Sequence, residues 1–261
     1  MRYVSTVAVV LLLLFAGCNT AGTGVTPTAD GTGVADTGTE TPDGVDASEV
    51  PGVEGNQLTD NTALLVVWYE AITTGHTDFH ANVEGSSEYP SMFVVEQYSI
   101  RLRNDTDQQL YAMETPELNQ SYYVDGDNVS VRDNDAGVVY YSNETNDFED
   151  NLGMVSLYPP LSLTHLYLLE WEATDTTTVN GEQHYVFEAT GVNETLWEQE
   201  HQGATNVDSV DGRMVVGSDG VFHTARVDIS GSNAVNATYS LRTDDSIEVT
   251  PPDWYNASQR G

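Results

Sequence analysis

A two-residue period in the hydrophobic pattern limits what this chain can fold into more than any other feature. From His76 onward, apolar residues alternate with polar ones, as Phe79, Ala81 and Val83 show. The segment from Val94 to Arg103 repeats the pattern. Because successive side chains of a β-strand point to opposite faces, this alternation predicts strands with one buried and one solvated face.

Short strands of this kind recur at even spacing through most of the chain. Turns such as "DGDN" and "DNDAG" separate them. The pair Asn180-Gly181 is typical of a two-residue hairpin turn, because both residues accept a positive φ. Evenly spaced short strands predict a meander of antiparallel neighbours. Beyond the hairpin, the expected strands after Arg103 are 109–115, 121–125, 129–132, 138–142, 213–216, 221–229, 235–241 and 247–250.

Helical spacing of apolar residues occurs in three segments. The first runs from Thr59 to Thr74, with Thr59 or Asp60 as its N-cap and Gly75 as its C-terminal stop. The second is "LSLTHLYLLEW", which follows Pro159-Pro160, and the third is a short helix over 193–203. The expected order is therefore one helix, a meander, a helical insertion and a second meander.

The start of the chain reads as an export signal over residues 1–17. Arg2 supplies a positive charge, and the apolar run Val7 to Phe15 is shorter than the roughly 20 residues of a membrane-spanning helix. The alternatives are a plain secretory signal or a short membrane anchor. Cys18, the only cysteine, follows Ala16-Gly17 directly. The sequence "FAGC" resembles the lipobox of lipoproteins, which implies that the Cys18 thiol receives a lipid and becomes the new N-terminus.

The segment 18–57 is expected to be a disordered, lipid-bearing linker. Residues 19–57 are rich in Thr, Gly, Asp and Pro, carry seven acidic residues and no basic one, and include no aromatic residue. Such a composition cannot bury enough apolar surface to fold. After a lipid anchor it reads as a tether, which leaves 58–261 as a single folded domain. With one cysteine no intramolecular disulfide can form, so this domain depends on core burial.

The charge balance excludes several partner classes. The chain has 41 Asp and Glu against 8 basic residues, all of them arginine, for a net charge of −33. No basic footprint exists for nucleic acid, anionic headgroups would be repelled, and the absence of lysine excludes a P-loop and Schiff-base chemistry. Attachment to a membrane would therefore come through the lipid on Cys18.

The same balance predicts a dependence on salt. A charge of −33 far exceeds the magnitude of about 2–8 that suffices for solubility, and its self-repulsion weakens the compact state in dilute buffer. Molar salt shortens the screening length to about 3 Å. An acidic, lysine-free composition resembles that of proteins from extremely halophilic archaea. The alternative is an acidic binding protein that works in ordinary salt.

The order of elements resembles the LolA/LppX-like lipoprotein fold over roughly 58–254. The segments "MVVGSDGVFHTARVDIS" and "VNATYSLRTDDSIEVTPPDW" are similar to its last strands. The resemblance implies an α+β domain in which a curved antiparallel sheet, an open half-barrel, is covered by one or two helices. It also implies a cavity for lipid or another apolar ligand, and it brings no catalytic residues. The whole chain also resembles haloarchaeal lipoproteins of unknown function. Such an archaeon has no outer membrane, so the cavity is implied and the lipoprotein-sorting task is not.

Aromatic side chains with polar tips suit the mouth of an apolar pocket. The chain has 14 tyrosines, and several fall on positions expected to point inward. The alternative is that these side chains simply fill the core. The candidate pocket residues are Trp68, Tyr98, Tyr111, Tyr185, Phe187 and Tyr239.

Metal sites and catalytic motifs have little support in the sequence. His76, Asp78 and His80 would share one strand face and are the only metal candidates; the alternative is a solvated polar face. The acidic turns at 125–128 and 133–135 lack the spacing of a Ca²⁺ loop. There is no G-x-S-x-G and no H-E-x-x-H, so we expect no catalytic residues and no cofactor.

Asparagine sequons are frequent in the predicted turns and strand ends. In an exported chain such positions can carry surface glycans. The seven sequons are Asn104, Asn119, Asn128, Asn143, Asn193, Asn236 and Asn256.

Three classes of function follow from these features. The sequence favours a lipoprotein on the extracellular face of the cytoplasmic membrane that binds an apolar ligand or lipid without catalysis. The alternative is a structural or interaction glycoprotein of the cell envelope without a ligand. A hydrolase or a metal-binding protein is the least favoured.

Replacing the lipid-accepting thiol tests the predicted anchor. We expect Cys18→Ser to release the protein from the membrane fraction or to leave the precursor uncleaved, because the hydroxyl cannot accept the lipid. Fractionation and intact mass measure both outcomes, with Asn19→Ser as the matched control. An unchanged membrane fraction and mass in Cys18→Ser would contradict the prediction.

Overall fold

The computed structural model divides the chain into two units, Met1–Asp43 and Gly44–Gly261, and its described residues all lie in the second. The signal segment, Cys18 and most of the predicted tether lie outside the described residues, as do Asn104 and Asn143. No helix among the described residues has the length and apolarity needed to cross a membrane. The structure describes residues 45–85, 96–103, 105–106, 108–115, 118–126, 128–142, 163–200, 206–232 and 234–259.

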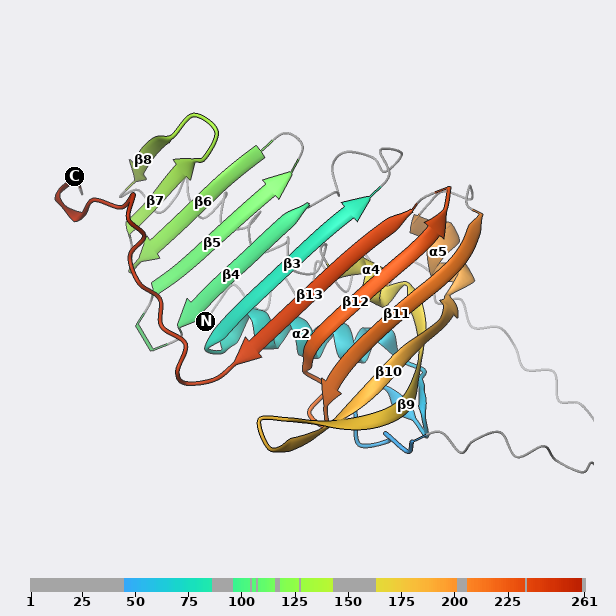
Figure 1. Cartoon of the computed structure of the whole chain (residues 1–261). Coiled ribbons are helices and arrows are strands. Elements are labelled where there is room, and N and C mark those ends of the chain that lie inside the picture. The colour runs from blue at the N-terminus through green and yellow to red at the C-terminus, as the bar shows by residue number, and fades with distance from the viewer. Residues whose placement is uncertain are drawn as a thin grey trace, which may run out of the picture. The chain divides into compact units, whose positions relative to one another are not determined.

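One antiparallel sheet of 13 strands organises the described residues. Its order is β1-β2-β9-β10-β11-β12-β13-β3-β4-β5-β6-β7-β8 (Figure 1). The first meander consists of β3 (Thr77–Gly85), β4 (Gln97–Arg103), β5 (Gln108–Thr115), β6 (Leu118–Asp125), β7 (Asn128–Asp133) and β8 (Val138–Ser142). The second consists of β9 (Leu169–Val179), β10 (Glu182–Val192), β11 (Val207–Gly217), β12 (Phe222–Gly231) and β13 (Val235–Thr243), with the short β1 (Val53–Glu54) and β2 (Gln57–Leu58) beside β9.

The two meanders meet where β13 pairs with β3. The ladder runs without a register shift from Val235 opposite Gly85 to Thr243 opposite Thr77. Strands far apart in the chain thus become central neighbours, and one continuous sheet results (Figure 1).

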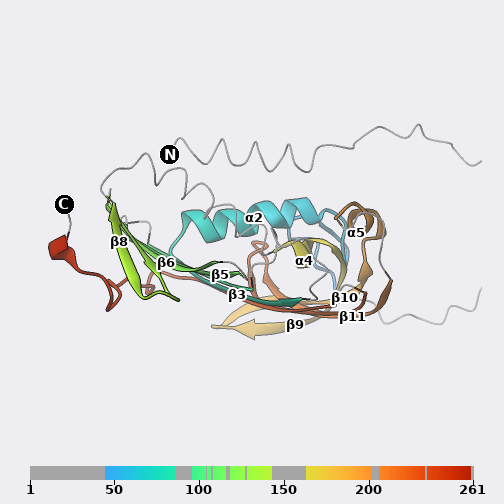
Figure 2. The ribbon, with the colours of Figure 1, turned by 90° about the horizontal axis from the view of Figure 1, so that it is seen from above.

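The helices lie on one face of this sheet (Figure 2). They are α2 (Asn61–Thr74), α4 (Thr164–Tyr167) and α5 (Glu194–Glu200), and a 3-10 turn, η2 (Ala257–Gln259), ends the described chain. Asp60 caps α2, since its carboxylate accepts hydrogen bonds from the backbone N–H groups of Thr62 at 3.0 Å and Ala63 at 3.1 Å. Such a cap satisfies donors that the first helical turn leaves open.

Aromatic rings hold α2 against the sheet. The Trp68 ring meets Phe222 edge to face at a centroid distance of 5.4 Å, and Phe222 meets Phe79 at 6.3 Å. The Trp68 indole N–H donates to the carbonyl oxygen of Gly220 at 2.8 Å. Gly220 has φ of +85°, and a Cβ there would lie 3.0 Å from Pro51, so the turn needs glycine. The helix and the β11–β12 turn are therefore fitted to each other.

The structure confirms the expected open antiparallel sheet with few helices, and the hairpin at Asn180-Gly181, with φ of 53° and 89°. The first helix is also confirmed, beginning at Asn61. The predicted strand 213–216 is part of the longer β11.

Two expected elements are wrong. Most of "LSLTHLYLLEW" was expected to be helical, but in the described part of this segment, from residue 163 on, the helix is limited to Thr164–Tyr167. Strand β9 begins at Leu169, because Leu169, Trp171 and Ala173 are buried on alternate positions. Residues 247–250 form no strand, since their backbone pairs with none of the described strands. Their apolar side chains are nevertheless buried.

The predicted boundary between tether and domain is also wrong. Ala47 and Val50 are at most 1% exposed and belong to the core, and β1 and the first residue of β2 lie within the predicted tether. The Ala47 N–H donates to Gly55 at 2.7 Å. The folded part therefore begins by residue 45, because a few valines suffice to anchor an otherwise polar segment.

Truncating the central tryptophan tests this packing. Trp68→Ala should lower the free energy of unfolding by about 3–5 kcal/mol, because it opens a cavity and leaves the Gly220 carbonyl without its donor. Val66→Ala, on the same helix but 50% exposed, should change it by no more than about 0.5 kcal/mol. Denaturant titration in molar salt measures both. Equal effects of the two variants would contradict the packing described.

Candidate functional site

The alternation along each strand sorts the side chains of the sheet onto two unlike faces. In β3 the residues Phe79, Ala81 and Val83 are buried beneath the helices, while His80 and Asn82 between them point to the opposite, solvated side. We call these the inner face and the outer face. In-register pairing continues the same separation across the neighbouring strands.

The six aromatic side chains named as pocket candidates come together on the inner face. All belong to one hydrophobic core and none is more than 7% exposed. Ala81 is the cross-strand partner of both Tyr98 and Tyr239, so a small side chain lies between two large ones. The six residues are Trp68, Tyr98, Tyr111, Tyr185, Phe187 and Tyr239.

A row of tyrosines crosses the inner face toward the β8 edge. Tyr111 of β5 pairs with Tyr122 of β6, which pairs with Val131 and then with Tyr140 of β8. Tyr111 and Tyr122 are 7% and 6% exposed, whereas Tyr140 is 58% exposed. Tyr122 and Tyr140 were not among the predicted pocket residues, although both stand at alternate strand positions. The apolar inner face therefore reaches solvent at one edge of the sheet.

Burial perturbs the tyrosines nearest to α2. Removal from water raises the pKa of Tyr98 well above its usual range, and the neighbouring Tyr111 and Tyr69 hydroxyls add to the effect. Burial likewise raises the pKa of Tyr111 and, more weakly, that of Tyr69. At the other end of the face, a hydrogen bond to Glu49 at 2.5 Å is the main reason that the pKa of Tyr185 is raised.

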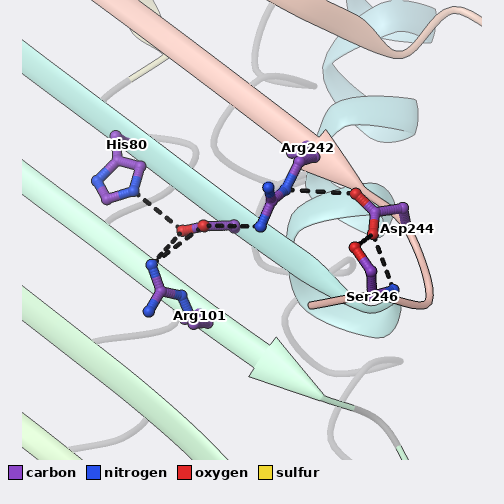
Figure 3. A network of polar contacts seen from close by, with 6 residues as sticks. His80, Arg101, Arg242, Asp244 and Ser246 are labelled. Carbon is purple, nitrogen blue, oxygen red and sulfur yellow. Dashed lines mark hydrogen bonds and ion pairs between the residues drawn. The ribbon is translucent and has the colours of Figure 1, made fainter. Parts of the chain in front are cut away.

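The outer face carries an ionic cluster centred on Asp78 (Figure 3). Its carboxylate accepts from Arg101 at 3.1 Å, from Arg242 at 3.5 Å and from His80 at 3.0 Å. Arg242 extends the cluster to Asp244 at 3.3 Å. The pKa of Asp244 is lowered, first by the hydrogen bond from the Ser246 hydroxyl. Strands β3, β4 and β13 are thereby tied together on their solvated side.

The three metal candidates do not converge. His80 contacts Asp78, but His76 contacts Asp245 at 3.2 Å and Asp105 at 3.6 Å instead. Asp78 is occupied by two guanidinium groups, which compete with any cation. In the part of the chain that the structure describes, no group of three His, Cys, Asp or Glu residues is arranged to hold a metal.

The nearest approach to a catalytic constellation is also on the outer face. His80 is hydrogen-bonded to Asp78, and its cross-strand partners are Ser99 and Ser240. Within the described residues neither serine hydroxyl is hydrogen-bonded to the His80 ring, and Arg101 and Arg242 bind the Asp78 carboxylate. A serine nucleophile needs a base within hydrogen-bond reach, so the arrangement does not support nucleophilic catalysis.

The acidic turns satisfy their own hydrogen bonds. The Asp133 carboxylate accepts from the backbone N–H of Ala136 at 2.9 Å, and the Asn128 amide donates to the Asp125 carbonyl at 3.3 Å. Local bonds of this kind are ordinary for Asp and Asn in turns.

Five of the predicted sequons lie within the described residues. Asn236 and Asn256 are exposed, while Asn119, Asn128 and Asn193 are partly buried. The Asn119 amide donates to Asp135 at 3.1 Å, and that of Asn236 donates to Asp228 at 3.0 Å. Glycosylation at any of these sites stays a prediction.

No family model matches this chain, and no curated protein matches its sequence. Solved structures with similarity to it include the lipoprotein LppX from Mycobacterium tuberculosis, at 15% identity and a TM-score of 0.36, with 73% of this chain and 100% of LppX covered. LprF from Mycobacterium bovis matches at 10% identity and a TM-score of 0.40, covering 77% and 100%. A LolA-superfamily protein from Nitrosomonas europaea matches at 11% and 0.22, covering 71% and 94%. These TM-scores are below 0.5, so we assign the site from the geometry of this chain alone.

Alkaline unfolding tests the burial of the tyrosine hydroxyls. A tyrosine in the unfolded chain ionises near pH 10, but burial raises the folded pKa of Tyr98 and Tyr111. The stabilisation is therefore complete below about pH 10 and is lost as the pH rises above it. Relative to their stability at neutral pH, Tyr98→Phe and Tyr111→Phe should unfold at higher pH than the unmodified chain.

Circular dichroism between pH 8 and about 12 measures the midpoint. Tyr140→Phe is the matched control, since Tyr140 is 58% exposed. An equal upward shift in Tyr140→Phe, or none in the two buried variants, would show that burial does not govern alkaline unfolding.

Proposed function

We propose that this chain is a non-catalytic binding module of the cell envelope that holds an apolar ligand or lipid on the inner face of its sheet. A lipid on Cys18 tethers it to the extracellular face of the cytoplasmic membrane, and residues 19–44 act as the spacer. The acidic, lysine-free composition supports an origin in a halophilic archaeon, and the exposed sequons support glycosylation of its surface.

The observation that carries the proposal is the tyrosine row of the inner face. Among the described elements, α2 packs on β3 and β4, whereas apolar side chains continue across β5 to β8. At the edge strand, Val138 is 44% and Tyr140 is 58% exposed. A monomer that exposes large apolar groups beside a buried apolar face has surface suited to an apolar ligand. The tyrosine hydroxyls supply polar tips at its border.

A second function is favoured by the packing beneath α2. Trp68, Phe79 and Phe222 fill that part of the inner face with the protein's own side chains. If the filling continues across β5 to β8, the domain is a structural or interaction glycoprotein of the envelope without a ligand. The absence of an activated nucleophile and of a metal cluster among the described residues is consistent with both functions and gives no support to a hydrolase.

Ligand extraction and probe binding separate the two functions. The full chain, purified in molar NaCl, is extracted with organic solvent for mass spectrometry and titrated with the fluorescent apolar probe 1-anilinonaphthalene-8-sulfonate. We expect a co-extracted lipid or other apolar compound and saturable probe binding by the extracted protein.

Variants locate the binding face. Tyr140→Ala should weaken probe binding by about three- to tenfold, since an aromatic contact is worth roughly 0.5–1.5 kcal/mol. Val66→Ala, which removes an exposed apolar group from α2, should leave it unchanged. A protein without extractable apolar compound and without saturable binding would be the structural glycoprotein instead.

A further inference from the structure

The outer face contains a hollow of about 560 Å³ that the proposed function does not use. It spans β13, β3, β4, β5 and β6, on the side of the sheet opposite the helices. Its volume lies within the range of about 300–1,000 Å³ that is typical of small-molecule sites.

Small side chains create the hollow. One cross-strand row on these five strands consists of Ser240, His80, Ser99, Ala112 and Ser121. Four of the five are serine or alanine, and these short side chains leave unfilled space above the middle of the outer face. On one side of this row stands the ionic cluster of Asp78 and its two arginines.

Longer polar side chains, all but one of them uncharged, border the hollow on its other side. The adjacent row consists of Thr238, Asn82, Gln97, Glu114 and Asn119. In a chain with 41 acidic residues, this row presents two amides and a hydroxyl at consecutive positions and only one carboxylate.

Three side chains of this border have free hydrogen-bonding groups. Asn82, Gln97 and Thr238 are exposed, and within the described residues their side chains have no hydrogen-bond partner. Each amide offers two donors and one acceptor, and the hydroxyl offers both roles. By contrast, the Asn134 amide at the far end donates to the Asn119 amide oxygen at 2.8 Å, so these two side chains already have a partner.

An aromatic side chain borders a second hollow that adjoins the first. This recess of about 230 Å³ shares His80, Ser99 and Ala112 with the larger hollow and is lined by Pro252 and the half-buried Trp254. The C-terminal segment that carries Trp254 is fixed on the outer face, since the Tyr255 ring meets Tyr123 edge to face at 4.7 Å. Free amides and hydroxyls thus lie next to an indole and a proline ring.

The charges of the lining select the ligand class. Arg101 and Arg242 are both bound to Asp78, so they are poorly available to an anion. The part of the chain that the structure describes has no metal-binding cluster, and the free groups of the border are too polar for a lipid tail. A neutral molecule with many hydroxyls and one apolar ring face can hydrogen-bond to the free amides and hydroxyl of the border and pack against the indole ring of the adjoining recess.

We propose that this hollow binds a neutral saccharide, with its hydroxyls on Asn82, Gln97 and Thr238 and a sugar ring face against Trp254. The serine and alanine row provides the room for the ring. This site lies on the outer face and the proposed apolar ligand site lies on the inner face. We therefore expect the saccharide and the apolar ligand to bind independently.

Calorimetric titration of the full chain in molar NaCl with maltotriose, cellotriose, chitotriose and mannotriose tests the proposal. We expect saturable binding of at least one of these neutral trisaccharides. Asn82→Ala should weaken it by about three- to tenfold, the usual effect of losing one hydrogen bond. Trp254→Ala should weaken it at least as much.

Asn236→Ala is the matched control, because it removes the same amide from the same face outside the hollow. Circular dichroism verifies that each variant is folded, and Tyr140→Ala should bind the saccharide as the unmodified chain does. Absence of saturable binding for all four trisaccharides, or equal weakening by Asn82→Ala and Asn236→Ala, would overturn the proposal.

Discussion

The pairing of β13 with β3 is the interaction on which the rest of the structure depends. It joins two meanders that are separate in the chain, and its register runs unbroken from Val235 opposite Gly85 to Thr243 opposite Thr77. On the inner side it aligns Phe222 with Phe79 beneath Trp68. On the outer side it lets Arg242 of one meander share Asp78 with an arginine of the other.

A single register therefore determines both surfaces that we assign. A slip by one residue would exchange the two faces, because side chains alternate with a period of two. The inner face collects the aromatic rings and is filled beneath α2, with tyrosines continuing to the β8 edge. The outer face, where serine and alanine stand in a row, is left with room above the sheet. From the net charge we expect this arrangement to be sensitive to salt, since screening weakens the repulsion between carboxylates.

Local features were predictable from sequence and long-range ones were not. Alternation identified most of the strands, Asn180-Gly181 identified a hairpin, and the six aromatic residues share one face. The partner of β3 had no local signal, because it lies about 150 residues away and long-range pairing depends on the whole fold. For the same reason the outer hollow was missed: it arises from small residues that meet only across strands. The start of the domain by residue 45 was not predicted, because the valines of this Gly- and Asp-rich segment show neither a helical nor a strand-like hydrophobic period.

Disulfide trapping across β13 and β3 tests the central claim most directly. Directly opposite residues in an antiparallel pair have Cα atoms about 4.5–5.5 Å apart, within the range for a disulfide. In a Cys18→Ser background, the pair Asn82→Cys with Thr238→Cys should form an intramolecular disulfide under mild oxidation, as measured by peptide mapping. The pair Asn82→Cys with Asn236→Cys, two residues out of register, should form little. Equal trapping of both pairs, or trapping of the second alone, would contradict the sheet described.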